Sequence, residues 1–251
     1  MGEVTFVGAG PGSADLITVR GARALGAAEV VLFDALIDPA LRDLAPHARW
    51  VDVGKRGFEH APRQTQINAL LVSYARRYRR VVRLKGGDPS VFGRLEEELG
   101  AVADAGIGCR VIPGVTAASA AAAASLRPLT RRGSGRSVAL STAMTHDGSL
   151  HAARRADSEV FYMAGRQLPA LGRLLQQAGW GGDTPVCVVS KAGWPDELTS
   201  SHQVRTLSHA ALLHAGRPTV VTVGAAARPV PGAGKTLAAP RAAASLRAMS
   251  N

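Results

Sequence analysis

The chain has 251 residues, of which 46% are hydrophobic and 20% charged, and its formal net charge is +11. This length can hold one large domain or two modest ones, each with a sizeable core. No apolar run reaches the roughly 20 residues that a membrane span needs, and the start of the chain lacks the basic segment of a secretory signal. We therefore expect a cytoplasmic protein that binds no membrane.

Short β-branched runs alternate with helical stretches in the first half of the chain. The clearest helix is predicted over residues 65–77, where apolar residues recur at intervals of three and four. Such alternation indicates a mainly parallel sheet that is buried on both faces. The predicted strands cover residues 4–7, 30–33, 50–53, 81–84 and 109–112.

The second half repeats the alternation after a helix of small residues at 116–125. We therefore predict an α/β fold with two domains, each with a parallel or mixed sheet of about five strands flanked by helices. The strands expected in the second domain cover residues 137–141, 159–163, 186–190, 202–206 and 219–223. The predicted segments are a first domain at 1–125, a linker at 126–136, a second domain at 137–228 and a disordered, basic tail at 229–251.

Most of the positive charge comes from arginines that are scattered along the chain, as in "ARRYRR" and "LTRRGSGR". The chain lacks zinc-finger spacing and a long Lys/Arg block, so its charge alone does not indicate a nucleic-acid partner. Guanidinium groups pair with carboxylates as well as with phosphates. A polyanionic small molecule is therefore an alternative partner, and a solvated basic surface explains many of these positions.

The chain contains two cysteines, Cys109 and Cys187, and each lies within an apolar run. Their wide separation argues against a metal site or a disulfide. We predict that both are reduced thiols in the core.

The segment "FVGAGPGSADLIT" is a strand that runs into a glycine-rich turn. Its first two glycines fit a dinucleotide fingerprint, and Asp34 lies where a ribose-binding acid belongs. However, Ser13 occupies the third glycine position, and Pro11 removes an N–H that would face a pyrophosphate. An NAD site is thus disfavoured. A tight turn into a helix capped by Ser13 or Asp15 explains only some of the glycines.

The segment "VVRLKGGDPSVFGRLEEE" places two glycines between a predicted strand and a charged helix. Glycine lets a ligand approach the backbone at the carboxyl edge of a parallel sheet. This segment is therefore a second candidate for ligand binding.

Together these segments form a series that resembles the uroporphyrinogen-III C-methyltransferases of the tetrapyrrole methylase superfamily. The resemblance is continuous over residues 4–133 and looser to about residue 224. It rests on "VGAGPGSADLIT", "VVLFDALI", "VGKRG", "INALL", "VVRLKGGDPSVFGR", "VIPGVTAA" and "PLTRRG" in this order.

The resemblance implies two α/β domains with S-adenosylmethionine in the cleft between them, a homodimer, and no metal ion. It implies methylation of uroporphyrinogen III at two ring carbons to give precorrin-2, which leads to sirohaem and cobalamin. Because this acceptor carries many carboxylates, arginines could orient it in a cleft.

Family positions also imply the residues that contact the cofactor. Two of them have simpler readings, since Thr116 could be a plain N-cap and Met163 could belong to the core. The implied contacts are Pro11, Gly86, Gly87, Asp88, Val91, Thr116, Ala117, Met163, Ala192 and Pro218.

For catalysis, the resemblance implies Asp34 as proton acceptor and Lys55 as proton donor, with Arg94 and Glu97 against the substrate. A carboxylate can stabilise the positive charge that develops on a pyrrole ring and accept the proton that leaves it. The simpler readings are a strand-end cap for Asp34 and an exposed helix start for Glu97.

Several positions depart from the family pattern, namely Ser90, Leu95, Glu96, Arg131 and the segment 141–146. They leave open a relative with the same cofactor and another acceptor, such as a later corrin precursor or a specialised metabolite. A non-catalytic protein that binds tetrapyrrole or nucleic acid is the third possibility.

Overall fold

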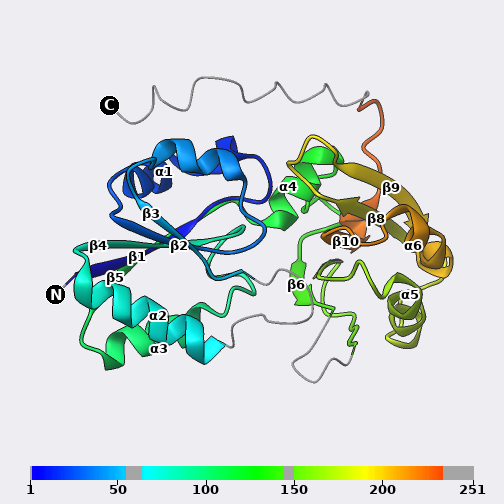
Figure 1. The fold of residues 1–251 in the computed structure, drawn as a ribbon. Helices are drawn as coiled ribbons and strands as arrows, with labels where there is room; N and C mark the ends of the chain where they lie inside the picture. Colours follow the sequence, from blue (N-terminus) through cyan, green and yellow to red (C-terminus); the bar gives the residue numbers. More distant parts are fainter. Residues whose placement is uncertain (1, 55–63, 144–149, 234–251) are drawn as a thin grey trace. The chain divides into compact units, whose positions relative to one another are not determined.

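The computed structural model describes residues 2–54, 64–143 and 150–233 of the chain (Figure 1). Its contacts divide these residues into two units, of which the first ends at Thr116 and the second begins at Ala117. The small-residue helix α4 (Ala117–Ala124) thus belongs to the second unit, whereas the domain boundary predicted from the sequence places it in the first domain. Most of the predicted tail lies outside the described residues.

The first unit contains a five-stranded sheet in the order β3-β2-β4-β1-β5, and every pair of neighbours is parallel. This confirms the predicted parallel sheet, and each strand begins and ends within one residue of its prediction. The strands are β1 (Glu3–Gly8), β2 (Val30–Phe33), β3 (Arg49–Asp52), β4 (Arg80–Lys85) and β5 (Gly108–Ile112).

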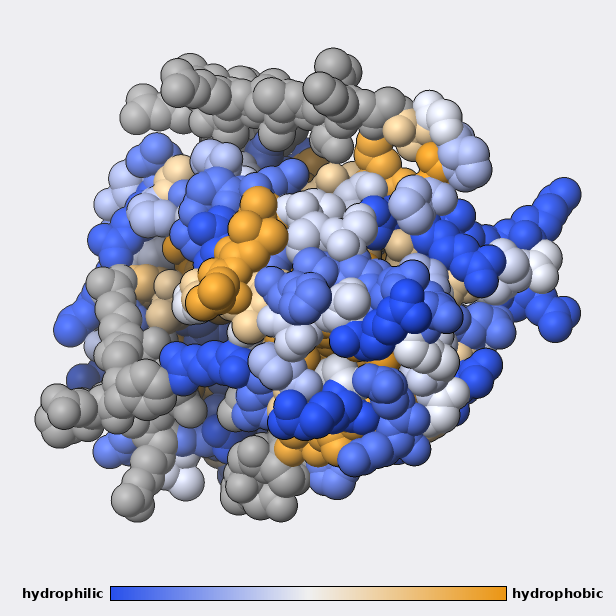
Figure 2. Space-filling model, turned by 90° about the vertical axis from the view of Figure 1, so that its right-hand side faces the viewer, coloured by the Kyte–Doolittle hydropathy of each residue, from blue (hydrophilic) through white to orange (hydrophobic). Residues whose placement is uncertain are grey.

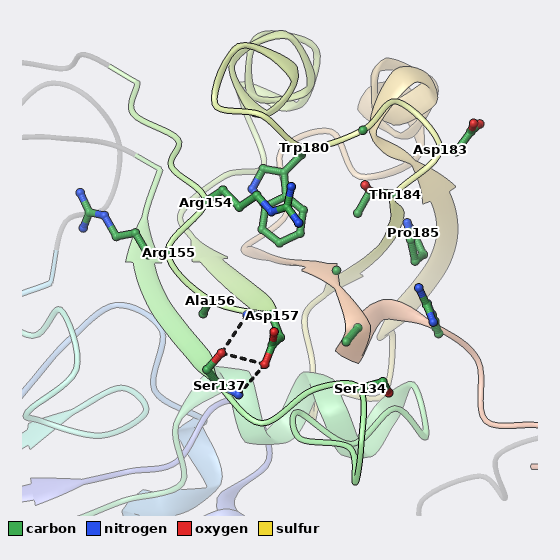
Figure 3. A pocket seen from close by; sticks show the side chains of 14 residues that line it. Ser134, Ser137, Arg154, Arg155, Ala156, Asp157, Trp180, Asp183, Thr184 and Pro185 are labelled. Atoms are coloured by element: carbon green, nitrogen blue, oxygen red, sulfur yellow. Dashed lines mark hydrogen bonds between the residues drawn. The ribbon is translucent and has the colours of Figure 1, made fainter.

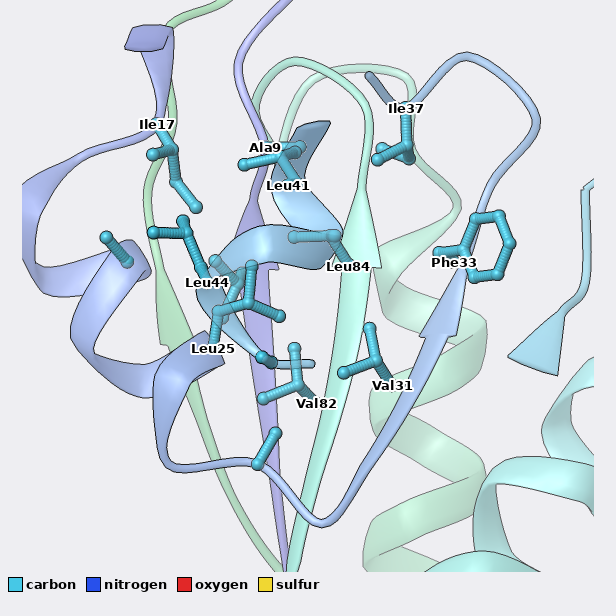
Figure 4. Packing of buried hydrophobic residues seen from close by; sticks show 14 of the residues in the cluster. Ala9, Ile17, Leu25, Val31, Phe33, Ile37, Leu41, Leu44, Val82 and Leu84 are labelled. Atoms are coloured by element: carbon cyan, nitrogen blue, oxygen red, sulfur yellow. The ribbon is translucent and has the colours of Figure 1, made fainter. Parts of the chain in front are cut away.

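Helices cover both faces of this sheet, with α1 (Val19–Gly26) on one face and α2 (Gln64–Arg77) and α3 (Leu95–Asp104) on the other (Figure 1). Alternate residues of a strand point to opposite faces. In β4, Val82 and Leu84 therefore join the core on the α1 side, where Leu25 and Leu41 also pack (Figure 4). The predicted helix over residues 65–77 is confirmed as α2.

The glycine-rich turn after β1 leads into a short 3₁₀ helix, η1 (Ala14–Leu16). Ser13 is its N-cap residue but makes no side-chain capping bond, and Asp15 lies inside the helix. Instead, the backbone N–H of Ala14 donates to the carboxylate of Asp38 (2.9 Å). The expectation that Ser13 or Asp15 caps this helix is therefore wrong.

The second unit contains a mixed five-stranded sheet in the order β6-β7-β10-β8-β9, in which only β6 and β7 are parallel. Four of its strands match their predictions closely. The fifth does not, because the chain leaves the sheet at Gln203 and forms the 3₁₀ helix η3 (Val204–His209), whose Thr206 hydroxyl accepts from the Gln203 N–H (3.1 Å). The strands are β6 (Val138–Thr142), β7 (Ser158–Tyr162), β8 (Pro185–Ser190), β9 (Leu198–Gln203) and β10 (Thr219–Gly224).

Among the described residues, the α-helices that accompany this sheet are α4, α5 (Leu168–Gln177) and α6 (Ala210–Leu213). Leucines of α5 pack with residues of η3, β8 and β10 in one core, while α4 packs against β8 and β10. None of the helices in the described part of the chain is both long and apolar enough to span a membrane.

The two cysteines differ in their surroundings. Cys187 is buried in β8, as predicted, whereas Cys109 is exposed. Cys109 lies on β5, which is the edge strand of the first sheet and exposes most of its residues. The prediction of a core thiol is therefore wrong for Cys109, because an apolar run does not reveal whether a strand lies at an edge.

Candidate functional site

Glycines from three loops meet at the carboxyl edge of the first sheet. Gly10 and Gly87 exchange backbone hydrogen bonds (3.2 and 2.9 Å) and have φ angles of 77° and 69°. A Cβ atom on Gly114 would lie 2.3 Å from the carbonyl oxygen of Gly87, and one on Gly8 would lie 2.6 Å from the Cα of Gly114. No side chain fits there, so the close approach of these loops itself requires glycine.

Gly86 differs from these glycines because the fold does not require it. It is exposed, and a Cβ there would meet only the Cβ of Leu36, at 4.0 Å. Its φ angle is outside the left-handed region that glycine favours. The open space above Gly86 is therefore available to a ligand that lies against the backbone.

The carboxylate of Asp88 joins two of the loops. One oxygen accepts from the backbone N–H of Ser90 (2.8 Å) and the other from that of Gly114 (2.8 Å). Asp88 thus holds the loop after β4 against the loop after β5, which fixes the shape of the edge. Its predicted contact with the cofactor stays a prediction.

Pro11 and Val91 lie in the same two loop regions and are half-buried. Pro11 is held between Gly10 and Gly12, which have φ angles of 77° and 98°. The backbone N–H of Val91 donates to the carbonyl of Asp88 (3.2 Å). The structure therefore brings these two predicted contacts to the carboxyl edge of the first sheet, together with Gly86, Gly87 and Asp88.

Asp34 follows β2 at the same edge, because β2 and β4 are neighbours in the sheet. Its carboxylate accepts a hydrogen bond from the guanidinium of Arg83 (2.6 Å), and its side chain is 33% exposed. Arg83 also pairs with Glu98 (3.1 Å), which in turn accepts from Lys85 (2.9 Å). Burial, and next the neighbouring charge of Arg83, lower the pKa of Lys85.

Arg83, Lys85 and Glu98 are not among the residues predicted from the sequence. One signal was present, because Arg83 and Lys85 are basic residues at alternate positions of a strand that is otherwise apolar. Cations at such buried positions require partners.

Arg94 and Glu97 form a two-pronged ion pair at the start of α3 (2.7 and 2.8 Å), and about half of each side chain is exposed. The hydrogen bond from Arg94 to Glu97 raises the pKa of Arg94. Arg94 has a φ of 54°, and Phe92 just before it has a φ of 52°, a conformation that costs energy in residues other than glycine. Leu95 begins α3 and packs against the core on the α2 and α3 side of the sheet. A leucine in place of the family's glycine at this position is therefore compatible with the helix.

Thr116 and Ala117 lie where the loop after β5 leads into α4. Thr116 directly precedes the first residue of α4, which is Ala117, and both are half-buried. Lys55 lies outside the described residues.

In the second unit, Met163, Ala192 and Pro218 lie at one edge of the sheet. Met163 follows β7, Ala192 follows β8, and Pro218 precedes β10, which is antiparallel to both strands. The backbone N–H of Lys191 donates to the carbonyl of Pro218 (2.9 Å), which joins the last two loops. Met163 is 51% exposed and has a φ of 57°, so the simpler reading that it belongs to the core is wrong.

A hydrogen-bonded chain of side chains begins at residues next to these two loops. Arg217 donates to the hydroxyl of Ser190 (3.0 Å), which bonds to one ring nitrogen of His214 (2.8 Å). The other ring nitrogen of His214 bonds to Ser200 (2.8 Å), which bonds to His202 (2.7 Å). His214 is fully buried, and burial together with the charges of His202 and Arg217 lowers its pKa to about 4. Ser190 directly precedes the loop of Ala192, and Arg217 directly precedes Pro218.

A hollow of about 740 Å³ occupies a different part of the second unit. It lies beside the beginning of β8 and the end of β10, at the edge opposite Met163, and Arg154 stacks on Trp180 there (5.2 Å; Figure 3). None of the predicted site residues lines it. The described residues contain no group of three or more side chains suited to hold a metal ion.

The parallel sheet of the first unit and the glycine loops at its carboxyl edge are typical of α/β proteins that bind a small ligand at such an edge. Residues 3–211 match the family of tetrapyrrole (corrin/porphyrin) methylases, and the chain belongs to this family.

The chain is similar to known members of the family in sequence and structure. It is 44% identical over 202 residues to the siroheme synthase of Hahella chejuensis. The aligned region covers 78% of this chain and 43% of that protein. It therefore spans less than half of that relative. The uroporphyrin-III C-methyltransferase of Thermus thermophilus, solved with S-adenosyl homocysteine, is 33% identical with a TM-score of 0.78, covering 90% of this chain and 98% of that one. A cobalt precorrin-4 methyltransferase is 28% identical with a TM-score of 0.78, covering 90% and 96%.

Proposed function

We propose that the chain transfers methyl groups from S-adenosylmethionine to two ring carbons of uroporphyrinogen III and so forms precorrin-2. The observation that carries this proposal is the glycine edge of the first sheet, where the open space at Gly86 directly follows β4, the strand whose Arg83 contacts Asp34. The similarity to a uroporphyrin-III methyltransferase over nearly its whole length supports it. The similarity to part of siroheme synthase agrees.

The residues at this edge fit the cofactor. Gly86 leaves room that a Cβ would fill, and Asp88 fixes the loops on either side. In the second unit, Met163 holds an exposed side chain in a strained conformation, which is common where residues serve a ligand. S-adenosylmethionine, when bound, supplies a methyl group that is already activated for transfer. We propose that these residues orient that group and that Pro11, Gly87, Val91, Thr116, Ala117, Ala192 and Pro218 complete its surroundings.

The role proposed for Asp34 concerns the proton that the acceptor loses. Once a ring carbon has gained a methyl group, the macrocycle carries positive charge and must lose a proton, and a carboxylate with one accessible oxygen can accept it. We propose this role for Asp34, and that of proton donor for Lys55.

Arg94 and Glu97 are proposed to bind the acceptor. The pair uses Nε and Nη2 of Arg94, and Nη1 makes no hydrogen bond to the described residues. Nη1 can therefore donate to a carboxylate of the acceptor while Glu97 holds the guanidinium in place.

A methyltransferase for a different acceptor is the second candidate. The similarity to a cobalt precorrin-4 methyltransferase favours it, as do the departures from the family pattern at Ser90, Leu95 and Arg131. An anaerobic competition decides between them: uroporphyrinogen III and precorrin-2 are offered together with labelled S-adenosylmethionine. We expect label first on uroporphyrinogen III. Label found only in a product made by further methylation of precorrin-2 would favour the second candidate.

Replacement of Gly86 with alanine tests the position of the cofactor. The added Cβ meets no protein atom closer than 4.0 Å, so the free energy of unfolding should change by less than about 0.5 kcal/mol. If the cofactor lies against Gly86, the methyl group should weaken its affinity by about tenfold or more. Isothermal titration with S-adenosylhomocysteine measures this affinity.

Gly100→Ala is the matched control, because Gly100 lies in α3 with nothing within 4 Å of an added Cβ. It should leave the affinity unchanged. Equal affinities for the wild type and Gly86→Ala would place the cofactor elsewhere.

The expected partners complete the proposal. We propose a cytoplasmic homodimer that takes a tetrapyrrole and neither a nucleic acid nor a membrane. The face shown in Figure 2 is mainly hydrophilic, with apolar side chains gathered in small areas. Light scattering measures the oligomeric state.

A further inference from the structure

Two cations on the central strand β4 are buried on the α2 and α3 side of the first sheet. Arg83 is 2% exposed and Lys85 is 3% exposed. Removing such charges from water costs several kcal/mol for each ion unless they are paired. Their partners therefore reveal why the strand carries them.

Glu98 of α3 is the shared partner and has no exposed surface. One carboxylate oxygen accepts from Nε of Arg83 (3.1 Å), and the other accepts from Nζ of Lys85 (2.9 Å). Gln64 donates a further hydrogen bond to this carboxylate (3.2 Å). Two cations and one anion leave one positive charge unbalanced, and Asp34 supplies the missing negative charge.

The guanidinium of Arg83 is held on every side. Nη1 donates to the carbonyls of Leu32 (3.4 Å) and Leu84 (3.2 Å), and Nε donates to Glu98. Its remaining nitrogen, Nη2, donates to Oδ1 of Asp34 (2.6 Å). Because a guanidinium is planar and rigid, these bonds fix the direction in which it meets Asp34.

The two oxygens of Asp34 consequently differ. Oδ1 is bound to Arg83, whereas Oδ2 accepts no hydrogen bond from the residues that the structure describes. The network ends at a carboxylate that is one-third exposed at the edge of the sheet. A network that served stability alone would not need a partially exposed member at this place.

We propose that Arg83 is a positioning residue that anchors Oδ1 of Asp34 and so presents Oδ2 to the proton that leaves the acceptor. Glu98 and the carbonyls of Leu32 and Leu84 hold Arg83 in the required orientation. The inference rests on the proposed function only for the identity of that proton, because the anchoring of Asp34 is a property of the protein alone.

Arg83→Met tests the proposal. It removes the contact with Asp34 but leaves the buried pair of Lys85 and Glu98 intact, so the core keeps a balanced pair. We expect kcat for methyl transfer to fall roughly 100-fold, as when a reacting group is displaced by about 1 Å. The affinity for S-adenosylhomocysteine should stay within about twofold of the wild type.

Lys85→Met is the matched control, since it removes the other cation from the same carboxylate and does not contact Asp34. Its kcat should stay within about threefold of the wild type, a small effect by comparison. Arg83→Lys retains the positive charge but lacks the planar guanidinium with its several donors. It should therefore recover only part of the rate that Arg83→Met loses. A double-mutant cycle with Asp34→Asn adds a second readout: the loss caused by Arg83→Met should largely disappear when Asp34 is already replaced.

Crystal structures of the wild type and Arg83→Met provide a readout that does not depend on activity. We expect one carboxylate orientation of Asp34 in the wild type and several in the variant. An unchanged orientation in the variant, or equal losses in the two backgrounds of the cycle, would overturn the role of Arg83. If Asp34 loses its orientation but the wild type methylates no tetrapyrrole, the proposed function fails while the anchoring stands.

Discussion

Asp34→Asn should lower kcat for methyl transfer by about 100-fold or more, because removal of a positioned general base typically costs a factor of 10²–10⁴. The amide has the same shape as the carboxylate, and its oxygen can still accept from Arg83. It cannot take up a proton as a carboxylate does. The affinity for S-adenosylhomocysteine should therefore change little, and single-turnover measurements under anaerobic conditions should place the loss in the chemical step.

Asp43→Asn provides the comparison, because Asp43 is exposed in the 3₁₀ helix η2 (Pro39–Leu44) and lies outside the glycine loops. Its kcat should equal that of the wild type. If Asp34→Asn kept more than about a third of the wild-type rate, the loss would be far below that of a general base and Asp34 would not be the proton acceptor.

The stability of the second unit should fall as the pH decreases from about 6.5 to about 4, because His214 is buried without charge. Its pKa is lowered to about 4 in the folded protein, whereas the unfolded chain takes up the proton near pH 6.5. Over this range the unfolded state binds more protons, so each pH unit costs up to about 1.4 kcal/mol. Integrated over the shift, the loss approaches 3 kcal/mol, on the order of a third of the stability of a typical domain. Above pH 6.5 the contribution is fully present.

His214→Gln isolates this contribution, because glutamine retains hydrogen-bonding groups but does not titrate. Urea unfolding of both proteins is followed by tryptophan fluorescence between pH 4 and 7.5. The stability of the wild type should decline more steeply toward acid than that of the variant, and His47→Gln, which alters an exposed residue of the first unit, should follow the wild type. Parallel curves for the wild type and His214→Gln would show that His214 is not held uncharged by the fold.

The strands of the first sheet could be predicted from the sequence because each is a short β-branched run between turn residues. The glycines of the two loops also indicated a ligand edge, since few other roles explain so many of them in succession. The sequence could not distinguish Gly86 from Gly87. That difference depends on φ angles and on the backbone of Gly114, which is distant in sequence.

Other features depend on contacts that no local pattern contains. Arg83 and Glu98 are 15 residues apart and become partners only when α3 packs on the sheet. The exposure of Cys109 follows from the position of β5 at the edge of the sheet, and strand order is not encoded in a single strand. The left-handed conformations of Phe92 and Met163 also arise from their surroundings, because neither residue favours them.

The measurement that tests the central claim most directly is the mass of the product formed anaerobically from uroporphyrinogen III and S-adenosylmethionine. We expect the tetrapyrrole to gain two methyl groups, with one S-adenosylhomocysteine released for each. Binding of S-adenosylmethionine with no change in the mass of uroporphyrinogen III would contradict the claim.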